Sequence, residues 1–184
     1  IVAGVVLLIV IAVAGWGIGI YNGLVGRQVA VDAAWSQVQN VYQRRMDLIP
    51  NLVETVKGAA NFEKSTFTEV TEARAKASQI ALTPQLLDDP ARFRQFQQAQ
   101  GQLSGALSRL LVTVENYPQL QATQNFRELQ NQLEGTENRI AVERRRFNET
   151  VGGYNTAIRV FPSSIVAGVF RFLPKAFFEA EAGA

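Results

Sequence analysis

Residues 1–20 read IVAGVVLLIVIAVAGWGIGI and contain no charged side chain. The Trp16 indole is the only side chain among them that can form a hydrogen bond. Twenty residues in a helix span about 30 Å, which is the thickness of the hydrocarbon core of a bilayer. The stretch therefore predicts a membrane-spanning helix, to which we assign residues 1–23.

An apolar stretch of this kind can instead be a cleavable signal peptide. The apolar centre of a signal is usually about 7–15 residues long and ends at a small-residue cleavage site. Here the apolar run continues into YNGLV at residues 21–25 without an Ala-x-Ala sequence. We therefore interpret it as the retained anchor of a single-pass membrane protein. Arg27 is the only basic residue close behind the span, so the side of the membrane that holds the rest of the chain stays open.

Residues 24–160 carry four stripes of apolar side chains at spacings of three and four residues, which is the period of an amphipathic helix. The stripes begin at Val31, Leu52, Phe93 and Phe126. No stretch shows the apolar and polar alternation that a strand requires. The pattern predicts an all-α domain, folded as an antiparallel up-and-down four-helix bundle with Trp35 and Tyr154 in its core.

The boundary between the first two helices depends on Pro50. The apolar period continues across this proline, so one long helix kinked at Pro50 and followed by two further helices is one interpretation. A single helix over residues 24–81 would be about 87 Å long, far longer than the helix that has to pack on it. A break at residues 46–50 gives two helices of more equal length and puts Pro50 in a first helical turn, where its missing N–H does no harm. We therefore expect the split bundle.

The tail over residues 161–184 follows the end of the fourth stripe. Four antiparallel passes return the chain to the membrane, so this tail should reach the bilayer surface. Its apolar part carries only two charges, both basic, and is too short to span a bilayer. We expect a short amphipathic helix in the interface, and a tail that packs back on the bundle is a compatible alternative. The residues expected at the interface are Phe170, Arg171, Phe172, Leu173, Lys175 and Phe177.

Gly15, Gly19 and Gly23 recur every four residues and share one face of the predicted span. A face without side chains lets a second helix approach closely, as in small-xxx-small pairs. We expect this face to mediate self-association, and the alternative is a glycine-rich helix without a partner. The many glutamines of residues 95–102 keep the charge of that helix low, which also favours a homo-oligomer.

The composition excludes several kinds of chemistry. The 184 residues contain neither Cys nor His, which removes thiol nucleophiles, disulfides, thiolate metal sites and histidine bases. Lys and Arg number 18 against 16 Asp and Glu, a near balance that does not favour nucleic-acid binding. No G-x-S-x-G or G-x-x-x-x-G-K sequence occurs. We therefore expect neither an enzyme nor a cofactor.

Six charged residues would meet if the second and fourth helices packed side by side. Carboxylates in such a group could bind Ca²⁺ or Mg²⁺, or act as an acid and base pair. The arginines among them favour ion pairs that fix the helix register, so we interpret the group as a structural polar cluster. Its members are Arg44, Arg45, Asp47, Glu63, Glu137 and Arg139. Asn148 and Asn155 are likewise expected to form caps or hydrogen bonds between helices.

Several uncommon sequence words occur in order from the end of the span to the tail. They include Tyr21-Asn22, Ala34-Trp35, RRMDLIPNLV at residues 44–53, Ala73-Arg74, Tyr117-Pro118, Asn125-Phe126, Thr136-Glu137, Tyr154-Asn155, Phe161-Pro162 and Phe177-Phe178. In these words the chain resembles the bacterial LemA family. It departs from the family pattern just before Glu63, where the family often shows an aromatic residue and a His, and this departure weakens any metal site at that turn.

The resemblance implies a single-pass protein of the bacterial plasma membrane with a mainly helical bundle and no established enzymatic activity. Family members are often encoded beside membrane proteases, and one relative takes part in building magnetosome membranes. We expect a membrane-anchored, non-enzymatic scaffold that self-associates and organises membrane or membrane-protein assemblies. The alternative is a binding module or adaptor that presents the bundle to a client such as a membrane protease. The lipid bilayer is an expected partner in both cases, and nucleic acid is not.

Overall fold

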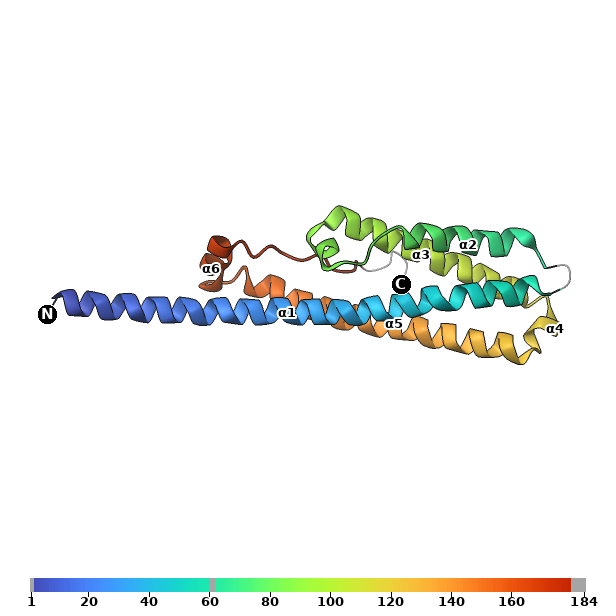
Figure 1. Ribbon diagram of the computed structural model, residues 1–184, viewed down its shortest axis with the longest axis horizontal. Coiled ribbons are helices and arrows are strands. Elements are labelled where there is room, and N and C mark those ends of the chain that lie inside the picture. The colour runs from blue at the N-terminus through green and yellow to red at the C-terminus, as the bar shows by residue number, and fades with distance from the viewer. Residues whose placement is uncertain (1, 60–61, 180–184) are drawn as a thin grey trace.

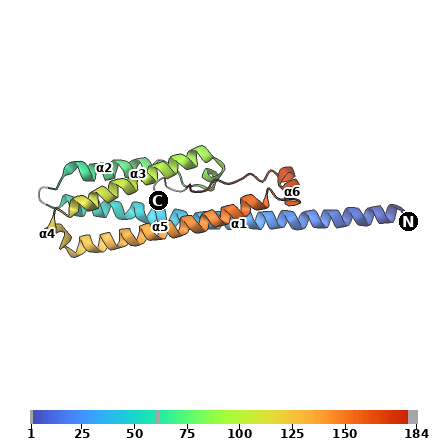
Figure 2. The same cartoon turned by 180° about the vertical axis from the view of Figure 1, so that it is seen from behind.

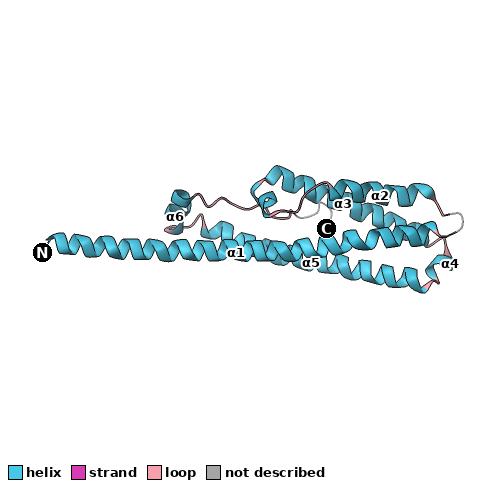
Figure 3. Ribbon diagram, in the orientation of Figure 1, coloured by secondary structure: helices cyan, strands magenta, loops and turns pink. Residues whose placement is uncertain are grey.

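The computed structural model describes residues 2–59 and 62–179, and every regular element in these ranges is helical (Figure 1, Figure 3). The elements are α1 (Val2–Lys57), α2 (Lys64–Ser78), the 3-10 helix η1 (Pro84–Asp88), α3 (Pro90–Val114), α4 (Pro118–Gln121), α5 (Gln124–Ala157) and α6 (Ser163–Phe170). The all-α fold class predicted from the sequence is confirmed.

The bundle is built along the second half of α1, which runs through most of the length of the molecule (Figure 1). α2 turns back antiparallel to α1, α3 runs out again, and α5 returns beside α1 (Figure 1, Figure 2). The helix pairs that pack most extensively are α1 with α5, α2 with α3, and α1 with α2. The chain thus makes four antiparallel passes and ends the fourth beside the middle of α1.

Local sequence explains where α3 and α5 begin. Asp89 caps α3 because its Oδ1 accepts the backbone N–H groups of Ala91 and Arg92 at 3.0 and 3.1 Å. Pro90 occupies the first helical position, where an N–H is not needed. Thr123 caps α5 in the same way, through its side-chain oxygen. Each long helix of the second half therefore starts at a capping residue that the sequence supplies.

The predicted break at residues 46–50 is wrong, because α1 passes through Pro50 and ends at Lys57. The return helix begins at Lys64, so the expected second helix over about residues 50–81 is also shorter than predicted. The alternative of one helix continuing to residue 81 is wrong as well. The number of passes is unchanged, and α5 still runs back toward the apolar half of α1.

A side chain of the neighbouring helix explains why α1 tolerates Pro50. Proline has no N–H, so the carbonyl of Met46, four residues earlier, loses its helical partner. Nε of Arg74 on α2 donates a hydrogen bond to this carbonyl oxygen at 3.1 Å, in a partly buried position. Pro50 itself is exposed. α2 thereby satisfies the acceptor that the proline leaves free, and the helix continues for two more turns.

The core consists of two clusters along α1. The cluster nearer the apolar half is aromatic, and Trp35 lies at its centre with ring centroids 5.3 Å from Phe147 and 5.8 Å from Phe93. Trp35 and Tyr154, the two aromatic residues predicted for the core, are both buried. The second cluster lies nearer the far end and is mainly aliphatic, with Leu52, Val53 and Val56 of α1 packed against α2 and α3.

The first half of α1 lies outside the bundle. Residues 2–16 are exposed along their whole length, and burial begins at Leu24. The most apolar window of 18 residues has a mean hydropathy of 2.5, and no other part of the described chain covers it. By its length and composition, this part of α1 is able to cross a membrane.

We predict that Arg74→Ala destabilises the bundle by about 1–3 kcal/mol, because the Met46 carbonyl then lacks a partner. In a Pro50→Ala background residue 50 supplies an N–H to the same carbonyl, so the same substitution should cost less than about 1 kcal/mol. Chemical unfolding of the four variants in detergent measures this coupling as a double-mutant cycle. Arg94→Ala, at an exposed position of α3, is the matched control. Equal costs in the two backgrounds would contradict this explanation of Pro50.

Candidate functional site

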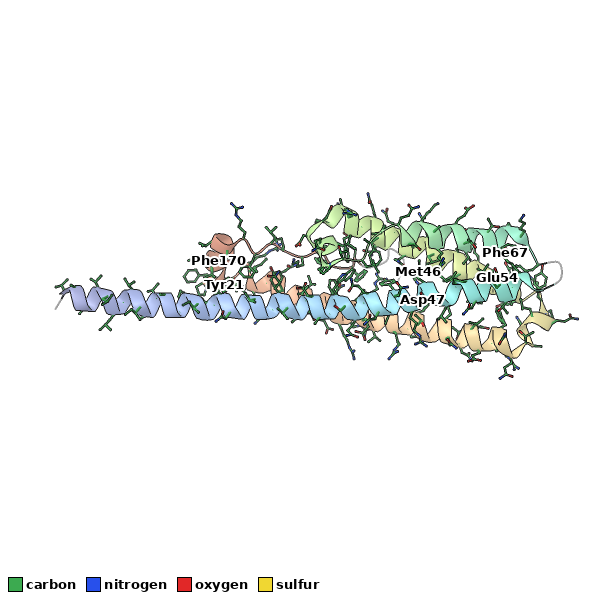
Figure 4. All side chains as sticks on the ribbon, in the orientation of Figure 1. Tyr21, Met46, Asp47, Glu54, Phe67 and Phe170 are labelled. Carbon is green, nitrogen blue, oxygen red and sulfur yellow. The ribbon has the colours of Figure 1, made fainter. Side chains whose placement is uncertain are left out.

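α6 lies against α1 at the level where the apolar half of that helix meets the bundle (Figure 1). Tyr21 of α1 contacts Phe170 at the end of α6 and Phe172 just beyond it, with ring centroids 4.7 and 5.7 Å apart (Figure 4). α5 positions α6 here, since it runs antiparallel to α1 and ends at Ala157. The C-terminal region therefore reaches the level at which the predicted membrane span ends.

Large apolar side chains are exposed on α6 and beside it. Phe161 is 79% exposed, Val169 71% and Phe170 58%. With Ile165 and Leu173, which are also exposed, they form a surface that we call the apolar pad. Exposed apolar side chains next to an apolar helix are typical of an element that lies in a membrane interface.

The helix expected in the interface is shorter than the tail from which it was predicted. α6 ends at Phe170, Arg171 caps it in a left-handed conformation, and residues 172–179 run back along the bundle without regular secondary structure (Figure 1). We call residues 172–179 the strap. Residues 180–184 of the expected tail lie outside the described residues. The tail thus divides into an exposed helix and a segment that packs on the bundle.

Four of the residues expected at the lipid interface belong to the strap, and two of them, Lys175 and Phe177, lie farthest along it from α6. Lys175 is buried, because its Nζ lies 2.6 Å from Oδ1 of Asp88 and this carboxylate draws the side chain onto the bundle. Phe177 is exposed but belongs to the strap rather than to α6. Of the other expected residues, Phe170, Arg171 and Leu173 are exposed at or near the end of α6, and Phe172 is half-buried against Tyr21.

Phe178 fixes the strap to the aromatic core. Its side chain is buried, with ring centroids 5.0 Å from Phe93 and 5.7 Å from Phe147. The guanidinium carbon of Arg144 lies 4.7 Å from the centre of the Phe178 ring. The strap therefore completes the core between α3 and α5, and its loss would expose the rings of both helices.

Three amide side chains hold the strap by its backbone. Each donates a hydrogen bond to the carbonyl oxygen of one strap residue and accepts one from the N–H of the same residue. An amide side chain suits this arrangement because it carries a donor and an acceptor side by side. The pairs are Asn155 with Lys175 (2.9 and 2.8 Å), Asn148 with Phe178 (2.8 and 2.9 Å) and Gln97 with Glu179 (2.9 and 3.2 Å).

Tyr154 adds a hydrogen bond at the start of the strap, where its hydroxyl donates to the carbonyl of Leu173 at 3.0 Å. Burial raises the pKa of this hydroxyl, and the carboxylates of Asp88 and Asp32 raise it further. Both effects disfavour the phenolate. Tyr154 therefore stays protonated at neutral pH and remains a donor.

Arg45 and Glu137 are the two members of the predicted polar cluster that form an ion pair. Arg45 is 1% exposed, and its Nη1 lies 2.8 Å from Oε1 of Glu137 and 2.8 Å from Oγ of Ser104. Nη2 donates to the side-chain oxygen of Gln100. These partners come from α3 and α5, so one buried charge of α1 links three helices. Arg45 also lines a groove of about 730 Å³ together with residues of α3 and α5 and with Phe178 of the strap.

The other four members of the predicted cluster do not join this pair. Arg44, Asp47 and Arg139 line a separate groove between α1 and α5, and Asp47 accepts a hydrogen bond from Gln43. Glu63 lies at the far turn, where it accepts a hydrogen bond from Ser65, because α1 runs beyond Pro50. Among the described residues, no three acidic side chains are grouped so that they could hold a metal ion.

The glycines of α1 are open to an approaching helix. Gly15, Gly19 and Gly23 are exposed, and a methyl group at any of these positions would meet no atom within 4 Å. Gly23 also lines a groove of about 560 Å³ between α1 and α5, together with Gly152 and Gly153 of α5. In the part of the chain that the structure describes, no element covers this face at Gly15 and Gly19.

The sequence allowed a tail that packs back on the bundle, and residues 172–179 take this course, but the residues that hold the strap were not found from the sequence. Asn148 and Asn155 were expected to cap or link helices, and they bind the strap instead. A signal was present, because asparagines seven residues apart lie on one face of a helix, two turns from each other. The aromatic pair after Pro174 is a second signal, since an apolar anchor after a proline favours an extended docked segment.

We predict that Glu137→Gln lowers the free energy of unfolding by about 1–3 kcal/mol, because the buried Arg45 guanidinium loses its charged partner. Asp47→Asn is the matched control, since Asp47 is exposed and bonded only to its neighbour Gln43 in the described contacts. Its effect should stay within about 0.5 kcal/mol. Chemical unfolding followed by circular dichroism compares the two variants. Equal effects would show that the Arg45–Glu137 pair contributes no more than a surface carboxylate.

Comparison with known proteins gives the family. The sequence matches the model of the LemA family over residues 34–184. Magnetosome protein MamQ of Magnetospirillum gryphiswaldense is 29% identical, with 83% of this chain and 62% of that protein aligned. Magnetosome protein MamQ 2 of Paramagnetospirillum magneticum is 27% identical over 86% of this chain and 64% of its own length. Protein LemA of Metamycoplasma hominis is 24% identical over 89% and 70%.

The chain spans less than two thirds of the length of the two MamQ relatives. The family match covers most of the bundle, α6 and the strap, and it starts one residue before Trp35. The resemblance in sequence words is thereby confirmed, and with the apolar half of α1 it indicates a membrane-associated helical protein. The chain belongs to the LemA family.

Proposed function

We propose that this chain is a single-pass, non-enzymatic scaffold of the bacterial plasma membrane that self-associates and organises membrane or membrane-protein assemblies. The observation that carries the proposal is the continuity of α1, which joins the apolar segment to the bundle without a hinge. A rigid junction transmits the position of the anchor to the bundle. It suits a protein that holds partners in a fixed arrangement better than one that needs a mobile domain.

The apolar pad supports a second contact with the bilayer. It lies beside Tyr21, at the level where the predicted span ends, and its phenylalanines are exposed. Two contacts with lipid, one through α1 and one through the pad, would restrict the tilt of the bundle. Arg171 at the end of α6 adds a positive charge, which attracts anionic lipid headgroups.

The glycine face of α1 supports self-association. In lipid there is no hydrophobic force between apolar helices, so their association depends on van der Waals contact. Glycines increase this contact because they let two backbones pack closely. Gly15 and Gly19 lie in the apolar half of α1, and none of the other described residues covers either of them. The names of the MamQ relatives place those proteins at the magnetosome, a membrane compartment, and we extend to this chain only a role in organising membrane.

The alternative is an adaptor that presents the bundle to a client such as a membrane protease. The open groove of about 730 Å³ between α3 and α5 is the observation that favours it. Native mass spectrometry of the protein in detergent separates the two proposals. A homogeneous oligomer without added client supports the scaffold, whereas a monomer that gains mass only with client supports the adaptor.

We predict that the apolar pad contacts lipid. A polarity-sensitive fluorophore on Phe170→Cys should be blue-shifted and quenched by lipid-borne quenchers, because α6 lies at the interface. The same label on Lys57→Cys, at the far end of α1, should remain in water. The chain has no native cysteine, so each label is unique. A label at position 170 that lipid quenchers do not reach, in folded protein, would contradict the interfacial position of α6.

We predict that Gly15→Ile combined with Gly19→Ile lowers the oligomer mass, since the added side chains hold neighbouring helices apart. Ala14→Ile with Gly17→Ile is the control, because these positions lie on another face of α1. Native mass in one detergent measures both variants, and circular dichroism checks that the bundle stays helical. An unchanged mass for the Gly15 and Gly19 variant would show that the glycine face is not an oligomer contact.

A further inference from the structure

The strap is bound in the way that a groove binds a separate peptide. The hydrogen bonds that hold residues 173–179 come from α3, α5 and η1, and not from the strap itself. Besides the three amide pairs, the N–H of Ala176 donates to the carbonyl of Leu87 in η1 at 2.9 Å. Main-chain hydrogen bonds of this kind supply affinity for an extended chain, while pockets for single side chains supply specificity.

The spacing of the two asparagines matches an extended peptide. Asn148 and Asn155 are seven residues apart in α5, which corresponds to a rise of about 10.5 Å along the helix. Phe178 and Lys175, the residues that they hold, are three apart, and three extended residues cover about 10 Å. The higher-numbered asparagine holds the lower-numbered strap residue, so the strap runs antiparallel to α5. α5 therefore carries two asparagines at the spacing needed to bind the backbone of an extended segment.

Two side chains of the strap occupy specific sites in the groove. Phe178 fills a pocket among the aromatic rings of Phe93 and Phe147, and Lys175 pairs with Asp88. The groove thus selects an extended segment with a basic residue three positions before an aromatic one. Phe177 of the strap is exposed, at the edge of a shallow groove along α5.

We propose that this groove also accepts the strap of a neighbouring copy, so that exchange of straps links copies of the chain. The inference rests on the self-association proposed above, which brings copies together. We assign a second copy as the occupant because its strap has the same sequence and can make every contact that the chain's own strap makes. Both copies are also held by α1 and the apolar pad, so their grooves lie at the same height above one bilayer.

The connection between α6 and the strap allows such an exchange. Arg171 is the one described non-glycine residue with a positive φ, at 57°, and it separates the end of α6 from the strap. A change of direction at this point redirects the strap without unfolding α6 or the bundle. A strap that moves to a neighbouring copy makes the same contacts there as in its own chain. The fraction of straps bound to a neighbour is therefore set by the local concentration of neighbouring grooves.

Disulfide trapping between two full-length variants tests the exchange. One chain carries Leu87→Cys and the other Ala176→Cys, at positions joined by a backbone hydrogen bond, and each has a different affinity tag. Both are reconstituted together in vesicles of bacterial lipid and oxidised. We expect a mixed disulfide dimer. Ser36→Cys, at an exposed position of α1, replaces Leu87→Cys in the collision control, and its yield with Ala176→Cys should be at background.

An asymmetric variant distinguishes strap exchange from simple proximity. Asn148→Ala removes the two bonds to Phe178, which should weaken the hold of its own groove by about tenfold. Placed in the Leu87→Cys chain, it should reduce the mixed dimer, because the receiving groove is impaired. Placed in the Ala176→Cys chain, it should raise the mixed dimer, because the donated strap is released. A purely structural role of Asn148 would affect both placements in the same direction and would overturn the proposal.

Three further results would also overturn the proposal. In the first, the Leu87→Cys/Ala176→Cys double variant forms a disulfide within one chain, the mixture of single variants gives no mixed dimer, and native mass shows an oligomer. Copies would then self-associate without exchanging straps. A monomer by native mass with no mixed dimer would refute both. Displacement of the strap by the peptide LPKAFFE, again without a mixed dimer, would assign the groove to client peptides.

Discussion

The hydrogen bond from Arg74 to the Met46 carbonyl satisfies the acceptor that Pro50 leaves free, and the helix that carries the apolar segment continues past this proline along the whole bundle. The turns of α1 beyond Pro50 carry Leu52, Val53 and Val56 into the distal core. The 34 residues of α5 match the stretch of α1 from Leu24 to Lys57 in length, so α5 returns to the level of Leu24. A helix that ended at Pro50 would leave the return passes without a surface to cover and would misplace α6.

In the C-terminal region, α6 and the strap direct their side chains to opposite sides, toward the outside and toward the core. α6 presents apolar side chains outward, while the strap directs Phe178 and Lys175 inward. Arg171 lies between them, and its left-handed conformation separates the two courses of the chain. The same short region therefore provides an exposed apolar surface and a closing element for the core.

The sequence predicted the features that depend on local period. The spacing of apolar residues located the helices and placed Trp35 and Tyr154 in the core. It failed at Pro50, because the compensating Arg74 lies 28 residues away and belongs to another helix. The ion pair of Lys175 with Asp88 joins residues 87 positions apart, so a local reading assigned Lys175 to lipid. Both Arg74 and the run around Pro50 belonged to the family pattern, but a pattern does not show which residues touch.

The strap shows a related limit. Asn148 and Asn155 read as ordinary polar residues of an amphipathic helix until the course of residues 172–179 is known. Their partners are backbone atoms, which carry no sequence signal of their own. Gln97 on α3 was still harder to recognise, since it is one of several glutamines on that helix and is distinguished only by its hydrogen bonds with Glu179.

Because α1 is one continuous helix, the direction in which its glycine face points determines the direction in which the bundle faces around the axis of α1. A helix advances by about 100° per residue, so Gly19 and Arg45 point roughly a quarter turn apart around the axis of α1. Where two copies meet symmetrically through their glycines, their α3–α5 grooves then face sideways rather than toward the common seam. A symmetric contact combined with a lateral one does not close on itself. If copies associate and exchange straps as proposed, such units would grow into rows or sheets, whose extent is limited by the membrane area and not by the geometry of a ring.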